Sequence, residues 1–270
     1  MMRVEPSAGP RVLRVLAPNP GPFTLEGTNT WVVGSDASLV IDPGPEDQNH
    51  LDAVLQAAGR VAAVLLTHRH LDHASGAGAL ARVTGAPVYA ASPGEDAQAA
   101  TDGDRIERAG VRLEVVAAPG HSPDHLVFFE PATRALFTGD AILGRGTSVI
   151  DPPEGDLTDY LRSLERMRGL TPRVIFPGHG PVVERAMEKI EEYVDHRRQR
   201  EEEVLRGLLR NPRTPQDLVP EIYAGYAKEL YPAASRSVLA HLLKLEREGR
   251  VVRSGQGDQF ALSEPSGSTT

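Results

Sequence analysis

Short apolar runs of strand-like length alternate with stretches of helical periodicity over the first two thirds of the chain. Such runs suit strands buried on both faces of a sheet that helices cover. Strands are expected at 38–44, 61–66, 85–90, 111–116, 135–138 and 174–177, with two more between 23 and 33. Apolar residues three or four positions apart predict helices at 47–58, 74–84, 151–170 and 184–209. The polar stretch 93–110 has no clear period and predicts a loop. The whole pattern predicts an α+β fold.

The pattern divides the chain into one large and one small domain. Residues 1–183 hold most of the strands and helices, and the charged segment 184–210 predicts one long linking helix. Residues 211–263 predict three helices and a β-hairpin, which is the order of a winged helix. Residues 264–270 predict a disordered tail, because they offer almost no apolar surface to bury.

Four side chains of metal-ligand type follow directly on the uncharged run 61–66. They are His68, His70, Asp72 and His73. Imidazole nitrogen and carboxylate oxygen suit Zn²⁺, Fe²⁺ or Mn²⁺, whereas Mg²⁺ and Ca²⁺ prefer shells of oxygen alone. On an extended segment His68 and His70 point to the same side, and a turn into a helix would redirect Asp72 and His73. Two diverging pairs of ligands suggest two metal ions.

The letters HRHLDH resemble the HxHxDH signature of the metallo-β-lactamase superfamily. That family needs three further ligands downstream, and His121, Asp140 and His179 each follow a predicted strand and a glycine. The resemblance implies a four-layer αβ/βα sandwich, followed here by the winged helix. It also implies two divalent ions at one edge, with Zn²⁺ as the first choice and Mn²⁺ or Fe²⁺ as alternatives. It assigns one ion to His68, His70 and His121, the other to Asp72, His73 and His179, and makes Asp140 the bridge.

Two segments resemble one branch of that superfamily, the β-lactamase-like protein 2 branch. They are TLEGTNTW around Asn29 and HRRQRE at 196–201, and the likeness extends over residues 12–262. Asn29 could line the mouth of the active site or close a turn. His125 could support a metal ligand or contact substrate, and Arg145 could reach substrate or face solvent.

Composition narrows the remaining possibilities. The chain has no cysteine, which excludes disulfides, thiolate ligands and a cysteine nucleophile. No apolar run approaches the roughly 20 residues that span a bilayer, and the first residues lack the apolar core of a signal peptide. We therefore expect a cytoplasmic protein that does not enter a membrane. Nothing in the sequence points to a stable protein partner, and self-association stays open.

The resemblance implies hydrolysis by a hydroxide that the two metal ions share, with Asp72 orienting it for attack. The branch likeness favours a phosphodiesterase that cuts single-stranded RNA, and arginines at 197, 198 and 200 could contact its phosphates if they face the cleft. The net charge of −8 at pH 7 speaks against this substrate. A thioester hydrolase of the glyoxalase II kind, or an enzyme for another small ester, is the alternative.

A DNA-binding regulator with a metal sensor site is a hypothesis from a different class. Residues 211–262 contain seven Arg or Lys and six Asp or Glu. This near balance is poor for binding phosphates, so the sequence favours an enzyme.

Overall fold

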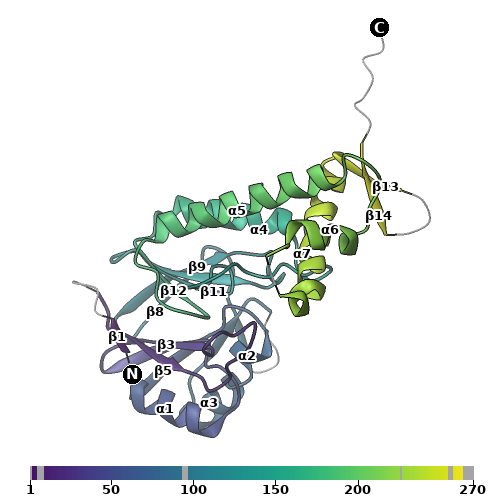
Figure 1. Cartoon of the computed structure of the whole chain (residues 1–270). Coiled ribbons are helices and arrows are strands. Elements are labelled where there is room, and N and C mark those ends of the chain that lie inside the picture. The colour runs from purple at the N-terminus through teal and green to yellow at the C-terminus, as the bar shows by residue number, and fades with distance from the viewer. Residues whose placement is uncertain (1, 5–8, 93–96, 226, 255–257, 264–270) are drawn as a thin grey trace.

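Two β-sheets pack face to face between two layers of helices, and a small domain follows at the carboxyl end (Figure 1). This computed structural model describes residues 2–4, 9–92, 97–225, 227–254 and 258–263. The predicted α+β fold with four layers is confirmed. The predicted disordered tail at 264–270 lies outside the described residues.

The first sheet has seven strands in sequence order. They are β1 (Met2–Val4), β2 (Val12–Leu16), β3 (Asn29–Gly34), β4 (Ala37–Ile41), β5 (Arg60–Leu65), β6 (Val88–Ala90) and β7 (Ala97–Ala99). Neighbours from β1 to β4 are antiparallel, and those from β4 to β7 are parallel.

The second sheet has five strands in the order β12-β11-β10-β9-β8. They are β8 (Arg105–Arg108), β9 (Val111–Ala117), β10 (Leu126–Glu130), β11 (Ala135–Gly139) and β12 (Val174–Pro177). Only β11 and β12 are parallel neighbours. Since β10 is antiparallel to both of its neighbours, β9 also runs in the direction of β11.

Strands in the middle of each sheet are mostly apolar because both of their faces are buried. Along β4, Leu39 and Ile41 belong to the core between the sheets, whereas Val40 belongs to the core under the outer helices. Side chains alternate in this way because successive residues of a strand point to opposite faces. Full burial of each such side chain stabilises the fold by about 1.5–3 kcal/mol relative to exposure.

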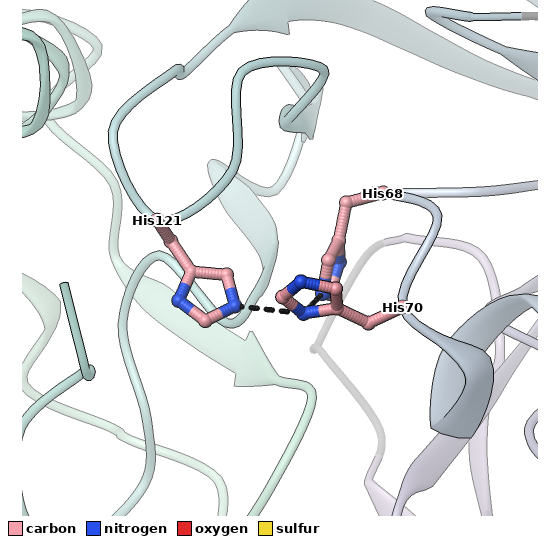
Figure 2. Close-up of side chains that lie close together, drawn as sticks. All are labelled: His68, His70 and His121. Atoms are coloured by element: carbon pink, nitrogen blue, oxygen red, sulfur yellow. Dashed lines mark hydrogen bonds between the residues drawn. The ribbon is translucent and has the colours of Figure 1, made fainter. Parts of the chain in front are cut away.

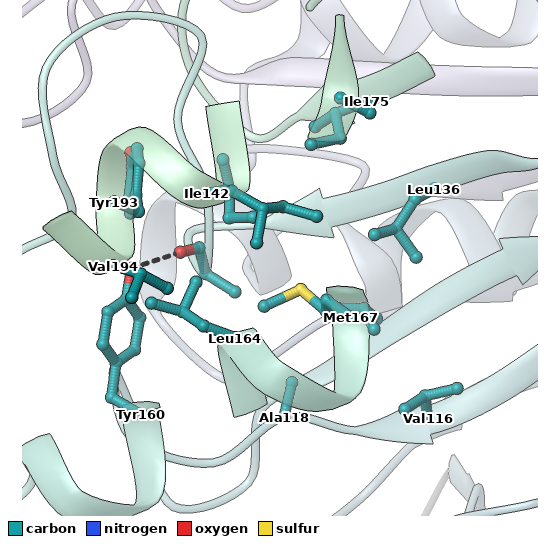
Figure 3. Packing of buried hydrophobic residues seen from close by; sticks show 14 of the residues in the cluster. Val116, Ala118, Leu136, Ile142, Tyr160, Leu164, Met167, Ile175, Tyr193 and Val194 are labelled. Carbon is teal, nitrogen blue, oxygen red and sulfur yellow. Dashed lines mark hydrogen bonds between the residues drawn. The ribbon is translucent and has the colours of Figure 1, made fainter. Parts of the chain in front are cut away.

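Helices cover the outer face of each sheet. The first sheet is covered by α1 (Gln48–Ala58) and α3 (Ala77–Thr84), and the second by α4 (Leu157–Gly169) and α5 (Ala186–Gly207). Figure 3 shows the second of these layers, where Leu164 and Met167 of α4 and Tyr193 of α5 pack in one cluster with strand residues such as Leu136. None of the described helices is long and apolar enough to cross a membrane.

The small domain contains α6 (Pro215–Ile222), a 3₁₀ turn (Lys228–Leu230), α7 (Tyr231–Arg247) and the hairpin of β13 (Val251–Ser254) and β14 (Gln259–Leu262). α6 begins with a capping box, in which Thr214 and Asp217 satisfy each other's backbone N–H groups. The end of α5 belongs to this domain as well, because Val204 and Leu208 pack in its core with Leu242. The segment expected to form the third helix, from His241 onward, is the second half of α7. The described part of the domain therefore has two α-helices and a 3₁₀ turn in place of three helices.

Two segments of the large domain differ from the sequence predictions, and three of its strands were not expected. Only β3 forms between 23 and 33, because the backbone turns at Leu25 (φ 55°) and Gly27 (φ 132°). The unexpected strands are β1, β2 and β10. The predicted loop 93–110 contains β7 and β8, whose residues are mostly exposed and therefore carry no apolar period.

Candidate metal centre

The seven predicted ligands meet at one edge of the sandwich. His68 and His70 follow β5, Asp72 and His73 lie in the short helix α2 (Leu71–Ala74), and His121, Asp140 and His179 follow β9, β11 and β12. The last three strands run in the same direction, so their carboxyl ends meet at this edge. Glycine at position 178 makes a close approach possible, because a Cβ there would lie 2.6 Å from His73 Cε1.

His68, His70 and His121 form the first group of ligand atoms (Figure 2). His70 Nδ1 lies 3.0 Å from His68 Nε2 and 3.1 Å from His121 Nε2. His68 is buried, whereas the side chain of His70 is 33% exposed. This group therefore borders the surface on the side of His70.

Asp72, His73 and His179 form the second group. His179 Nε2 lies 3.2 Å from His73 Nε2 and 3.1 Å from Asp72 Oδ2. Asp140 stands between the groups: its Oδ1 is 3.3 Å from the Nε2 atoms of both His73 and His179, and its Oδ2 is 3.7 Å from His121 Nε2. Oδ1 is buried and has no hydrogen-bond partner among the described residues.

Neighbouring carbonyl groups determine which imidazole nitrogens carry protons. His121 Nδ1 lies 2.8 Å from the Val149 carbonyl oxygen, and His179 Nδ1 lies 3.2 Å from that of Gly27. A carbonyl only accepts, so both Nδ1 atoms donate and both Nε2 lone pairs point into the cluster. Converging lone pairs and an unpartnered carboxylate oxygen repel one another without a cation. The described residues therefore fit a centre of two metal ions.

Charge inside the cluster opposes the effect of burial. Burial disfavours the charged forms of His73 and Asp140, but their mutual attraction outweighs it, so the pKa of His73 is raised and that of Asp140 is held well below its usual range. Burial lowers the pKa of His68 well below its usual value, and the charge of His73 adds to this effect. His68 is thus neutral, which is the form that binds a metal.

Asp42 supports ligands of both groups from behind. Its Oδ2 accepts from His73 Nδ1 at 2.9 Å and from the Thr67 hydroxyl at 2.7 Å. The Thr67 hydroxyl, which has given its proton to Asp42, can then accept from His68 Nδ1 at 3.0 Å. Asp42 is buried and has φ of 51°, a conformation that Asp tolerates better than most residues.

Replacing Asp42 by asparagine is expected to weaken binding of both metal ions by roughly tenfold to a hundredfold, as for other groups that orient metal ligands. An amide oxygen cannot hold both His73 and Thr67 with the strength of a carboxylate. Chelator competition with purified protein measures this directly. The exposed Asp36 gives a control, because Asp36→Asn should leave both affinities unchanged. Wild-type affinities in Asp42→Asn would contradict the expected role.

The three further candidate residues lie in different surroundings. Asn29 is buried away from the mouth, and its amide donates to the carbonyls of Pro177 and Gly180, on either side of His179. His125 is buried, with its ring stacked on His68 at 4.8 Å, and its Nε2 accepts from the Asp140 backbone N–H at 3.2 Å. Arg145 alone of the three borders the pocket beside the metal centre.

That pocket has a volume of about 510 Å³ and is lined at one end by His70, Asp72, His121 and Asp140. Most of its remaining wall is apolar, with Phe23, Leu25, Leu143, Val149 and Pro152 among the lining residues. Two arginines also line it, and each is paired with a carboxylate. Arg145 Nη2 lies 2.8 Å from Glu26 Oε1, and Arg236 Nε lies 2.5 Å from Asp151 Oδ1.

Several residues at this site were not found from the sequence. Arg236 belongs to α7, so the small domain contributes one lining residue to the pocket. Ser148 and Val149 approach the ligands through a hydroxyl and a backbone carbonyl, and Thr67 does so through its hydroxyl. Only the position of Thr67, directly before the first histidine, could have indicated a role in advance.

Two family models match the chain. The model of the metallo-β-lactamase superfamily matches residues 23–108 and 92–179, and that of the β-lactamase associated winged helix domain matches residues 214–259. These segments agree with the four-layer domain and with the small domain that follows it.

Relatives of known name match over nearly the full length. A "Beta-lactamase-like protein 2 homolog" of Drosophila melanogaster is 36% identical over 94% of this chain and 94% of its own. An "Atrochrysone carboxyl ACP thioesterase" of Aspergillus fumigatus is 34% identical over 93% of this chain and 87% of its own.

Solved structures share the fold. A metallo-β-lactamase family protein from Thermus thermophilus has a TM-score of 0.78 at 24% identity, over 93% of this chain and 98% of that one. A protein crystallised in a di-iron-bound form has a TM-score of 0.54 at 28% identity, over 65% of this chain and 96% of that one. The chain therefore belongs to the metallo-β-lactamase superfamily, as a hydrolase whose catalytic domain is followed by the winged helix domain associated with that family.

Proposed function

We propose that this chain hydrolyses thioesters of apolar acyl groups at a centre of two divalent ions. One ion would be held by His68, His70 and His121, the other by Asp72, His73 and His179, with Asp140 between them. Mixed nitrogen and oxygen donors suit Zn²⁺, Fe²⁺ or Mn²⁺. When bound, such ions lower the pKa of water and polarise a carbonyl group.

The protein side chains orient the reacting groups. Asp72 lines the pocket with a side chain that is 30% exposed, so its carboxylate can accept a hydrogen bond from the attacking water and direct a lone pair at the carbonyl carbon. The apolar wall near Leu143 and Val149 excludes bulk water from the acyl group. His125 holds the backbone of Asp140 and so keeps that carboxylate in place.

The choice of substrate rests on one observation: the pocket wall is mostly apolar, and its two arginines are paired with carboxylates. An RNA strand needs cations that can leave their partners to neutralise successive phosphates. Arg145 and Arg236 face Glu26 and Asp151 instead. An acyl chain, in contrast, would bury apolar surface along this wall.

The ionisation of the pocket acids also favours a leaving group that needs no proton. Burial opposes ionisation of Asp72 and Asp140, but their imidazole neighbours outweigh it and lower the pKa of both. A hydrogen bond from Arg69 lowers the pKa of Glu154. These three carboxylates therefore offer no proton at neutral pH. A thiol, with a pKa of about 8.5, can leave as the thiolate, whereas an alcohol leaving from a phosphodiester benefits from an acid.

The RNA hypothesis depended on three arginines of α5 facing the cleft, and their contacts lie elsewhere. Arg197 is buried and donates to the Ser148 carbonyl, and Arg200 donates to the Ile222 carbonyl. Arg198 lies on the surface, 3.6 Å from Asp195. None of the three lines the pocket. Three relatives are named thioesterases, which supports the same choice.

A substrate panel tests the proposal. Metal-loaded protein is given acetyl and octanoyl thioesters of N-acetylcysteamine, S-D-lactoylglutathione, a single-stranded RNA oligonucleotide, nitrocefin and bis-p-nitrophenyl phosphate. We expect the octanoyl thioester to have the highest kcat/KM. RNA cleavage by the wild type with inert thioesters would overturn the proposal and restore the RNA hypothesis.

A pocket variant sharpens this test. Phe23→Ala should lower kcat/KM for the octanoyl thioester by about tenfold and leave the acetyl thioester nearly unchanged, because each buried methylene contributes roughly 1 kcal/mol. The control is Val83→Ala, a similarly exposed apolar residue outside the pocket. Equal losses for both thioesters would argue against an acyl chain on this wall.

A further inference from the structure

A buried arginine at the junction of the two domains lacks the usual partner of such a residue. Arg197 of α5 is 4% exposed, and none of the carboxylates in the described part of the chain pairs with it. Its Nε is buried with no hydrogen-bond partner. The nearby His241 is kept neutral, because burial and then the charge of Arg197 lower its pKa well below the usual value. A buried cation is costly, so its contacts need an explanation.

The contacts of Arg197 lead toward the metal centre. Its Nη2 donates to the carbonyl oxygen of Ser148, and its guanidinium lies 5.2 Å from the centroid of the Tyr160 ring. Tyr160 in turn donates to the Ala141 carbonyl at 2.6 Å, which Figure 3 shows as a dashed line. Ser148 and Ala141 both lie in the segment that follows β11. Arg197 therefore contacts this segment directly at Ser148 and through Tyr160 at Ala141.

The segment Ser148–Val149 touches two of the proposed ligands. The Val149 carbonyl accepts from His121 Nδ1 at 2.8 Å and so directs His121 Nε2 into the first group of ligand atoms. The Ser148 hydroxyl donates to the carbonyl of Asp140 at 2.5 Å. A guanidinium fixed on the Ser148 carbonyl therefore fixes the orientation of the next carbonyl in the chain.

We propose that Arg197 is a positioning residue for the metal centre, acting through Ser148–Val149 on His121. The inference rests on the proposed ligands of the first ion. His68 is oriented by Thr67, which Asp42 holds, and His70 follows two residues later on the same segment, so neither histidine contacts the segment that Arg197 holds. Loss of Arg197 therefore weakens the first ion most, through His121. The second ion is affected little, because the Ser148 hydroxyl contacts the backbone carbonyl of Asp140 and not the carboxylate between the two groups.

Lysine cannot replace arginine in this position. A guanidinium is planar, so it can lie over Tyr160 and still direct one N–H at a carbonyl oxygen. An ammonium group is compact and more strongly hydrated, and it would draw water into the junction. Arg197→Lys keeps the charge and removes the geometry, whereas Arg197→Met removes both.

The same helix offers a matched control. Arg200 lies three positions further along α5, donates to the Ile222 carbonyl at 2.9 Å and has its guanidinium 4.5 Å from the centroid of the Tyr223 ring. Arg200 thus shares the carbonyl and aromatic contacts of Arg197, but it also pairs with Glu203 Oε2 at 2.6 Å, and its partners Ile222 and Tyr223 lie in the winged helix domain. Arg200→Lys thus perturbs a comparable arginine without touching the segment at Ser148.

The test measures the affinity of each metal equivalent by chelator competition, with urea unfolding of the metal-free proteins alongside. Arg197→Lys and Arg197→Met should weaken one of two equivalents by roughly tenfold to a hundredfold and leave the other within about threefold. Arg200→Lys should leave both unchanged. Loss of both equivalents together, in step with lower stability, would overturn the proposal in favour of a purely structural role, as would two unchanged equivalents.

A double variant separates this inference from the proposed function. In a His121→Ala background, Arg197→Lys should have no further effect on the weakened equivalent, because the two residues act in series. Additive losses would show that Arg197 acts by another route. If wild-type protein bound no metal at all, the proposed centre itself would be wrong; two bound equivalents with unaffected Arg197 variants would refute only the positioning role.

Discussion

Replacing Asp72 by alanine is expected to lower kcat/KM by about a thousandfold or more, equivalent to about 4 kcal/mol of transition-state stabilisation. The change removes a ligand of the second ion and the carboxylate that orients the attacking water. The side chain is 30% exposed and α2 is only four residues long, so its loss affects the site far more than the core. Steady-state kinetics on the best thioester measure the effect, and circular dichroism checks the fold.

Asp52→Ala serves as the matched control for this variant. Asp52 is an exposed acid on α1 whose contact is with Gln48, four residues earlier, so activity should stay within about twofold of the wild type. An Asp72→Ala protein that is folded and retains a tenth of the wild-type activity would contradict the role given to this carboxylate.

Removal of the metal ions is expected to abolish hydrolysis and to lower Tm by about 10 °C or more. At a free metal concentration about a thousand times the Kd, each bound ion stabilises the folded state by about 4 kcal/mol, and this domain would bind two. Without cations the lone pairs of His121 and His179 point into the cluster beside the unpartnered Asp140 Oδ1. Elemental analysis before chelation should find about two equivalents per chain.

Readdition of metal distinguishes the site from a simple carboxylate cluster. Zn²⁺ or Mn²⁺ should restore both activity and Tm, whereas Mg²⁺ should restore neither, because the ligands are mostly imidazole nitrogens and Mg²⁺ prefers oxygen. One equivalent or less in the isolated protein, unrestored by Zn²⁺ or Mn²⁺, would speak against two ions.

The sequence was most informative where one short segment indicated both its secondary structure and its chemical role. The run before Thr67 is apolar because β5 is buried on both faces, and the histidines that follow have few other uses at a strand end. A cluster of this kind can be predicted even when the expected strand boundaries are wrong by one or two residues. The same holds for Asp140 and His179, each behind a glycine after a buried strand.

Contacts made through the backbone or across domains could not be predicted in this way. The Val149 carbonyl orients His121 whatever side chain stands at 149, so no residue type marks that role. Arg197 sits among many charges of a helix whose sequence suggests solvent exposure, yet its own side chain is buried. Asn29 acts on the segment around His179 from far away in the chain, and only the folded structure joins the two.

α5 is 22 residues long, which corresponds to a rod of about 33 Å. Its first half, with Ile190 and Tyr193, completes the core over the second sheet, and its second half, with Val204, completes the core of the winged helix (Figure 1). Unfolding of either core would expose apolar side chains of this one helix to water. The two domains therefore form one cooperative unit in unfolding. A protein truncated after residue 209 would expose the apolar side chains of the second half of α5, so it would not be an independently stable catalytic domain.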